Sequence, residues 1–210
     1  MTVRRIPVFL AGAAIVWGAV LGRADAAMVK PIENLSGMLA ERQVKDLADS
    51  YKQAAMALRR SMERMVDGMA LDSPAALDES LRMVADTRRA LSAARGATTT
   101  LSTYVAARRD SLQGEDARFV PLAELDGELE APYHRAMGEF LDASSRMLKY
   151  AAANFAAVSR GGTDERKQYE GLYQEYLHAL NAFNEASATR SRRLNEWLNR
   201  YADIDDLIPQ

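Results

Sequence analysis

Glu175 and His178, in the stretch QYEGLYQEYLHAL, have the residue types and the spacing of a metal-ligand motif. A Glu three residues before a His on one helix is the arrangement of ferritin-like di-iron bundles, which use two such motifs and further carboxylates, all projecting inward. The sequence lacks a second motif, because the other histidine, His134, follows Glu130 by four residues with Pro132 between them. We therefore expect an incomplete motif rather than a di-iron centre.

Helical geometry also turns this pair away from the expected core. At about 100° per residue, Glu175 and His178 lie nearly opposite the apolar stripe of their own helix. That stripe consists of Tyr169, Tyr173, Tyr176, Leu180 and Phe183. We expect the pair to face outward, as a weak metal candidate that could at most bridge two copies of the chain, and we expect no cofactor.

Three methionines at helical spacing offer a second kind of metal chemistry. Met62, Met65 and Met69 carry thioether sulfurs, which are ligands for Cu(I). The same positions continue an apolar stripe with steps of three and four residues, and methionine fills irregular gaps in cores well. Core packing is therefore the favoured interpretation, and copper handling is the weaker alternative.

Catalysis would have few suitable side chains in this sequence. The chain has no cysteine and two histidines, and histidine is the ordinary general base near neutral pH. It contains no Gly-x-Ser-x-Gly elbow, no His-Glu-x-x-His motif and no phosphate-binding glycine loop. The lack of cysteine also excludes disulfides, thiolate zinc sites and c-type haem attachment. We expect a protein that is not an enzyme.

Tyrosines provide the first candidate binding surface. Tyr169, Tyr173 and Tyr176 lie in one helical stripe, and an aromatic stripe is usually core. Tyrosine hydroxyls need hydrogen-bond partners or water when they are buried. These three residues are therefore predicted to pack in the core, or to line a pocket or meet another protomer.

Threonines provide the second candidate binding surface. Thr98, Thr99 and Thr100 lie in the stretch 96–103, where poor helix formers interrupt a long helical pattern. The favoured interpretation is a tolerated kink whose hydroxyls bond to the backbone or face solvent. The alternative is a narrow polar patch through which a ligand enters.

The densest basic stretch is Arg190-Ser191-Arg192-Arg193, and Trp197 follows it. Arg192, Arg193 and Trp197 could meet anionic lipid headgroups or an acidic partner. A solvated helix end is the favoured interpretation of the whole stretch, because positive charge there offsets the negative end of the helix dipole.

The elements that must position these residues follow an export signal. A basic start, an uncharged run at residues 6–22 and Ala24-Asp25-Ala26 form a secretory signal peptide, residues 1–26, with cleavage expected after Ala26. The alternative is an uncleaved inner-membrane anchor formed by residues 6–22, a run at the short limit for spanning a bilayer. Without residues 1–26 the formal charge is −4, which does not favour a nucleic-acid partner. We expect an exported, periplasmic protein.

Beyond the signal, apolar residues recur at helical spacing. The pattern predicts helices at about 32–70, 74–112, 121–159 and 164–203, and a tail at 204–210. Pro132 should kink or restart the third helix, and Gly161-Gly162 should end it. Short connections make consecutive helices antiparallel, so residues 27–203 are predicted to form one all-α domain, an up-down-up-down four-helix bundle with coiled-coil-like seams.

This organisation favours an interaction or scaffold module that presents helix faces to an envelope protein or to itself. The alternative is a periplasmic ligand-binding or sensor module with a pocket between helices, because the topology is similar to the ligand-binding bundle of bacterial chemoreceptors. A metal-binding or copper-handling protein is the weakest hypothesis. Membrane contact is expected only through an uncleaved N-terminus or through the basic end of the fourth helix.

Overall fold

The computed structural model describes residues 42–110, 120–124 and 126–202, most of which are helical. The long helices are α3 (Arg42–Gly68), α4 (Pro74–Ala107), α5 (Ala131–Ala153) and α7 (Thr163–Ala202). Two short elements flank α5, namely the π-helical turn η2 (Asp126–Glu130) and α6 (Phe155–Arg160). The predicted signal peptide at 1–26, the alternative anchor at 6–22 and the tail at 204–210 lie outside the described residues.

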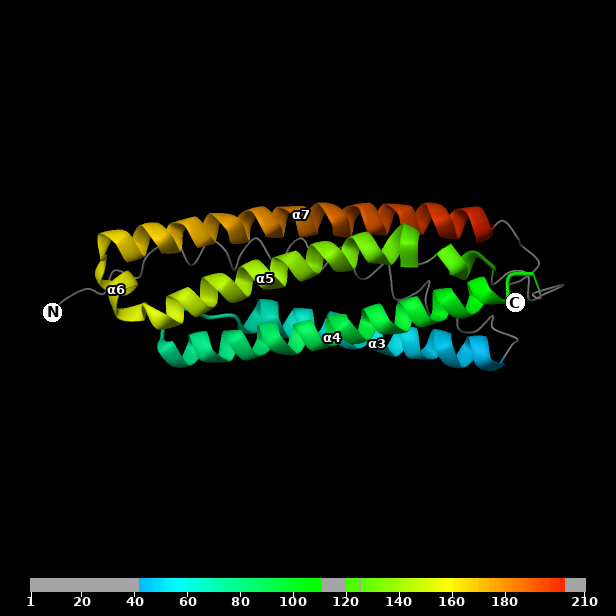
Figure 1. The fold of residues 1–210 in the computed structure, drawn as a ribbon, viewed down its shortest axis with the longest axis horizontal. Helices are drawn as coiled ribbons and strands as arrows, with labels where there is room; N and C mark the ends of the chain where they lie inside the picture. Colours follow the sequence, from blue (N-terminus) through cyan, green and yellow to red (C-terminus); the bar gives the residue numbers. More distant parts are fainter. Residues whose placement is uncertain (1–41, 111–119, 125, 203–210) are drawn as a thin grey trace.

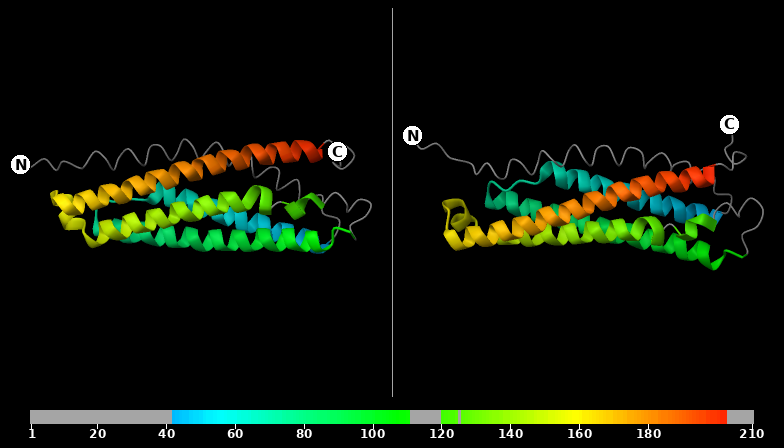
Figure 2. Two further views of the ribbon diagram at one scale, coloured as in Figure 1. Left: turned by 45° about the horizontal axis from the view of Figure 1, so that its top comes forward. Right: turned by 90° about the horizontal axis from the view of Figure 1, so that it is seen from above.

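The long helices pack lengthwise, and each runs opposite to the one before it (Figure 1). α3 packs mainly on α4, α4 on α5, and α5 on α7, whereas direct packing between α3 and α7 is sparse. The views in Figure 2 show the four helices extending along a common direction. The prediction of an all-α fold with four long helices in contact is confirmed.

Capping residues fix both of the turns that lie at the α6 end of the bundle. Ser73 is the N-cap of α4, where its hydroxyl accepts a hydrogen bond from the N–H of Ala76 at 3.2 Å, and a proline follows in the first turn. α6 ends at Gly161, whose φ of 82° lies in the left-handed region that favours glycine. The N–H of Gly162 then donates to the carbonyl of Ala157 at 2.9 Å, which closes the turn into α7.

The helix expected at 121–159 is divided into several elements. Residues 120–124 form a 3-10 turn, η2 follows, and α5 begins only at Ala131. Pro132 lies in the first turn of α5, where its missing N–H sacrifices no helical hydrogen bond, so the helix restarts there. This restart is one of the two outcomes that the sequence predicted for the proline.

Two further helix ends were not expected. Asn154 separates α5 from α6, because its side-chain amide donates to the carbonyl of Tyr150 at 3.1 Å and its backbone leaves the helical region. α4 ends at Ala107 rather than near residue 112, because the N–H of Arg108 turns to the carbonyl of Val105 in a tighter closing turn.

The apolar faces form two core clusters along the bundle. The larger cluster includes Met65, Met137, Phe140, Leu148 and Phe183, which are almost completely buried. The smaller cluster, nearer the start of α3 and the end of α7, includes Val44, Leu101, Val105, Leu129 and Leu194. Since η2 and the start of α5 pass from one cluster to the other, side chains there lie at the junction of the two cores.

Packing is the main source of stability in this fold. The chain has no cysteine, so it forms no disulfide.

Within the ranges that the structure describes, none of the helices combines the length and the apolar character needed to span a bilayer.

Candidate functional site

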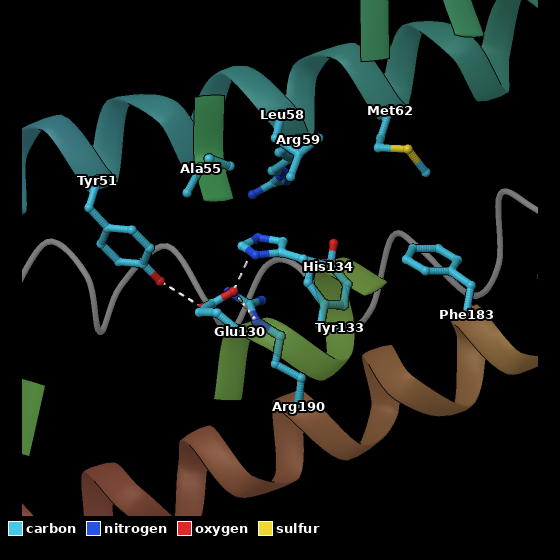
Figure 3. A pocket seen from close by; sticks show the side chains of 11 residues that line it. Tyr51, Ala55, Leu58, Arg59, Met62, Glu130, Tyr133, His134, Phe183 and Arg190 are labelled. Carbon is cyan, nitrogen blue, oxygen red and sulfur yellow. Dashed lines mark hydrogen bonds and ion pairs between the residues drawn. The ribbon is translucent and has the colours of Figure 1, made fainter. Parts of the chain in front are cut away.

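Four polar side chains are buried at the junction of the two core clusters (Figure 3). They are Tyr51 of α3, Glu130 of η2, His134 of α5 and Arg190 of α7, and none is more than 5 % exposed. Arg190 donates from Nε to Oε2 of Glu130 at 2.9 Å and from Nη2 to Oε1, which makes a bidentate pair. The hydroxyl of Tyr51 donates to the same Oε1 at 2.7 Å. One carboxylate therefore connects α3 and α7, two helices that otherwise pack sparsely on each other.

The π-helical turn η2 brings Glu130 into this position. The hydroxyl of Ser102 on α4 donates to the carbonyl of Leu122 and accepts from the N–H of Asp126, both at 3.1 Å. Thr99 donates to the carboxylate of Asp126 at 2.8 Å. π-helical turns are rare and often occur at functional positions. α4 thus holds η2 in place, and η2 directs its last residue into the core.

Burial and neighbouring charges shift the protonation of the cluster. Burial lowers the pKa of His134 from 6.5 to about 4, although the charge of Glu130 acts in the opposite direction. The positive charges of Arg190 and Arg95 reinforce this decrease. Burial, followed by the charge of Glu130, raises the pKa of Tyr51 well above 10. Burial, the largest single effect, lowers the pKa of Arg190, but the charge and hydrogen bond of Glu130 together with Tyr51 and Tyr133 raise that pKa overall.

His134 has one ring nitrogen without a partner among the described residues. Its Nε2 lies 3.5 Å from Oε2 of Glu130, so the tautomer with the proton on Nε2 directs that proton toward the carboxylate. Nδ1 is then a buried hydrogen-bond acceptor to which no described residue donates. A cavity of about 30 Å³ adjoins the ring, and its other walls include Leu58, Met62 and Phe183. This geometry is suited to recognising a hydrogen-bond donor.

The three predicted tyrosines form a stacked row along α7. The ring centroids of Tyr169 and Tyr173 are 6.4 Å apart, and those of Tyr173 and Tyr176 are 5.9 Å apart. The row continues through Phe140 to Phe183 beside the polar cluster. Tyr176 is buried, whereas Tyr169 and Tyr173 are partly exposed. Burial of its hydroxyl, which has no partner among the described residues, raises the pKa of Tyr169 to about 12.

The threonine stretch at 96–103 remains helical within α4, and the hydroxyls of Thr98, Thr99, Thr100 and Ser102 bond to the protein itself. Thr98 is buried, and both Thr98 and Thr100 donate to the carbonyl one turn earlier at 2.8 Å. Thr99 instead reaches Asp126 of η2. The exposed side of the stretch lines an open depression. The stretch therefore positions η2, and a role in ligand binding stays a prediction.

The basic stretch near the end of α7 is divided between the surface and the core. Arg192 and Arg193 are exposed, and Arg193 donates to the carbonyl of Glu128 at 3.3 Å. Arg190 is buried against Glu130, so the interpretation of the whole stretch as a solvated helix end is wrong for this residue. The side chain of Trp197 lies outside the described residues.

The two sets of metal candidates lie on different helices, the Glu175 and His178 pair on α7 and the first two methionines on α3. Glu175 and His178 are exposed on α7, and Glu175 pairs with Arg146 at 3.0 Å. Met62 and Met65 are buried in the larger core cluster, and Met69 packs against it. In the part of the chain that the structure describes, no three His, Cys, Asp or Glu side chains are grouped so as to hold a metal ion.

Sequence reasoning missed the buried cluster, although helical spacing contains a signal for it. Glu130 and His134 begin a second α5 stripe that continues at Met137 and Leu141, so two polar residues occupy apolar-stripe positions. Arg190 likewise fills the stripe between Ser187 and Leu194.

Comparison of the chain with protein-family models, curated proteins and solved structures finds no match.

Proposed function

We propose that the protein is an exported, non-catalytic helical-bundle module that binds a protein partner in the cell envelope. The supporting observation is a group of partly exposed, large apolar side chains at the end of the bundle that contains α6. We call this group the apolar end. It consists of Met69, Leu71, Met83, Phe155, Tyr169, Leu172 and Tyr173.

The apolar end is partly exposed because the long helices differ in extent. α3 stops at Gly68, while α6 and the first turns of α7 extend past its end (Figure 1). The side chains there pack against the larger core cluster and keep part of their surface exposed. A partner that covered them would complete their burial.

The residue types at the apolar end also favour a protein partner. Tyrosine, phenylalanine and methionine are enriched at the centres of protein interfaces, and tyrosine is frequent among the residues that dominate binding energy. Tyr169 and Tyr173 are already stacked, so little side-chain freedom would be lost when a partner covers them.

The other two parts of the proposal rest on separate observations. Export rests on the sequence of residues 1–26, which has the pattern of a cleaved signal. The non-catalytic part is supported by the buried cluster, where both oxygens of Glu130 already accept hydrogen bonds from Arg190 and Tyr51. A carboxylate saturated in this way is poorly placed to act as a general base.

Photo-crosslinking in cells tests the proposal. A photoreactive amino acid at Leu172 or Tyr173 should yield a discrete crosslinked product, whereas the same probe at the exposed Glu175 of α7 should not. The product's mass distinguishes a second copy of this chain from another envelope protein. Equal yields at all three positions, or no product at Leu172 and Tyr173, would contradict the proposal.

A further inference from the structure

The cavity beside His134 contains a hydrogen-bonding group that no described residue uses. Buried acceptors in proteins are nearly always bonded, so a buried imidazole nitrogen without a protein donor indicates a place for another donor. The side chain of His134 is only 4 % exposed, and its Nδ1 has no partner among the described residues. Figure 3 shows the ring in the space between α3 and Glu130.

The charges around the cavity limit what could bind there. The negative charge of Glu130 is already matched by Arg190 and by the hydroxyl of Tyr51, so no free carboxylate faces a cation. Arg59 also lines the cavity, and its Nε donates to Glu63 at 2.8 Å, so its positive charge is matched as well. An anion would meet the lone pair of Nδ1. A neutral imidazole, which the lowered pKa of His134 maintains at neutral pH, accepts a hydrogen bond from a neutral O–H or N–H group.

The walls of the cavity are polar at one side and apolar at the other. Glu130 and His134 lie at the polar side, while Leu58, Met62 and Phe183 form the apolar side (Figure 3). A water molecule needs roughly 10–15 Å³ of such space. The cavity of about 30 Å³ is roughly two to three times that volume, so it accommodates two to three groups of that size.

The cavity lies between two helices that pack only sparsely on each other. Residues of α3 and α7 both line the cavity, and direct packing between these two helices is sparse. Their main connection at this level is the contact of Tyr51 and Arg190 with Glu130. A small molecule entering between α3 and α7 would meet the apolar walls before it reaches the imidazole.

We propose that this cavity is a binding site for a small neutral alcohol, whose hydroxyl donates to Nδ1 of His134 and whose short apolar chain packs against Leu58, Met62 and Phe183. The site is separate from the apolar end and does not depend on the proposed protein partner. It would add ligand binding to the function of the bundle.

Ethanol and acetonitrile are matched probes for this site, because each has three non-hydrogen atoms but only ethanol donates a hydrogen bond. Imidazole nitrogen NMR of the full chain reports the two histidines, His134 and His178, separately once His178→Leu has assigned the signals. Ethanol should shift the Nδ1 signal of His134 in a saturable way. The hydroxyl bond should make ethanol bind about 2- to 10-fold more tightly than acetonitrile.

Each outcome of the titration decides the proposal. A saturable shift of the His134 Nδ1 signal that is retained in His178→Leu, with ethanol binding at least about 2-fold more tightly than acetonitrile, supports it. Equal binding of both probes would show an apolar cavity without hydroxyl recognition, and so overturn it. A Nδ1 signal that neither probe changes would mean that water keeps the site, which also overturns the proposal. The comparison of the two probes uses the unmodified protein, so it does not depend on the folding of any variant.

Discussion

Arg190→Met should destabilise the protein by about 3–5 kcal/mol, because it leaves a buried carboxylate without its counter-charge. Glu130 is 1 % exposed, and the substitution removes both of its charge-assisted hydrogen bonds, so only the hydroxyl of Tyr51 still donates to it. Glu130→Gln keeps an acceptor for Tyr51 but removes the negative charge that the buried guanidinium faces, with a similar loss of about 3–5 kcal/mol.

The double variant distinguishes a coupled pair from two independent losses. With both charges removed, no uncompensated ion stays in the core. We therefore expect the combined loss to be smaller than the sum of the single losses by about 2–3 kcal/mol. Arg190→Lys, which keeps the charge but loses the bidentate geometry, should give an intermediate loss and guards against a single variant that does not fold.

Urea unfolding followed by far-ultraviolet circular dichroism measures these free energies. The control is the same cycle at Arg146 and Glu175, a pair 3.0 Å apart in which both side chains are more than half exposed. Its coupling should not exceed about 1 kcal/mol. Losses below about 1 kcal/mol at Glu130 and Arg190, or losses that simply add, would refute the reasoning that this is a buried, coupled ion pair.

Three further predictions use the same unfolding assay. The stability that neutral His134 contributes is fully present above its unfolded pKa of 6.5 and is lost as the pH falls toward its folded pKa of about 4. Protonation of this residue on unfolding should therefore lower the unfolding free energy by about 2 kcal/mol between about pH 8 and pH 5. If His134→Leu showed the same change of unfolding free energy with pH, the prediction would be contradicted. Ser80→Ala should lower the unfolding free energy by about 1–3 kcal/mol, because the buried hydroxyl accepts from the N–H of Ala70 and donates to its carbonyl. An unchanged unfolding free energy would show that these bonds do not hold the loop between α3 and α4. Gly161→Ala should cost about 1–2 kcal/mol, because a Cβ there meets no neighbour and only the left-handed backbone opposes it; a gain in stability would be inconsistent with that conformation.

The helices could be predicted because their signals are local. Apolar spacing marked the buried faces, and Ser73, Pro132 and Gly161 each act through a few neighbouring residues. At the break, the side-chain amide of Asn154 and its own backbone N–H both donate to the carbonyl of Tyr150, an arrangement that spacing alone does not reveal. The π-helical turn η2 is likewise held by contacts with α4 rather than by its own sequence.

The buried cluster could not be predicted in the same way, because its partners lie far apart in the sequence. Glu130 is 79 residues from Tyr51 and 60 residues from Arg190. Glu130 and Arg190 do occupy apolar-stripe positions, but spacing does not name their partners, and an arginine in a basic stretch usually faces water. Only the packing of α3, η2 and α7 shows that the three side chains share one site.

The tyrosine row was predicted in part. Residues 169, 173 and 176 stack on one side of α7, as their spacing indicates, but their exposure changes along the row. Helical periodicity identifies a face and does not show where a neighbouring helix stops. Tyr176 packs against Phe140 of α5 and is buried, whereas Tyr169 and Tyr173 lie nearer the start of α7 and stay partly exposed.

The most direct test of the proposed function is the crosslinking yield from a photoreactive residue at position 172 in two variant backgrounds. Tyr173→Lys places a charge in the apolar end, and Glu175→Lys makes a comparable change on an exposed part of the same helix. The proposal predicts that Tyr173→Lys lowers the yield at least about tenfold while Glu175→Lys leaves it nearly unchanged, with both variants folded by circular dichroism. Equal yields in the two backgrounds would contradict partner binding through the apolar end.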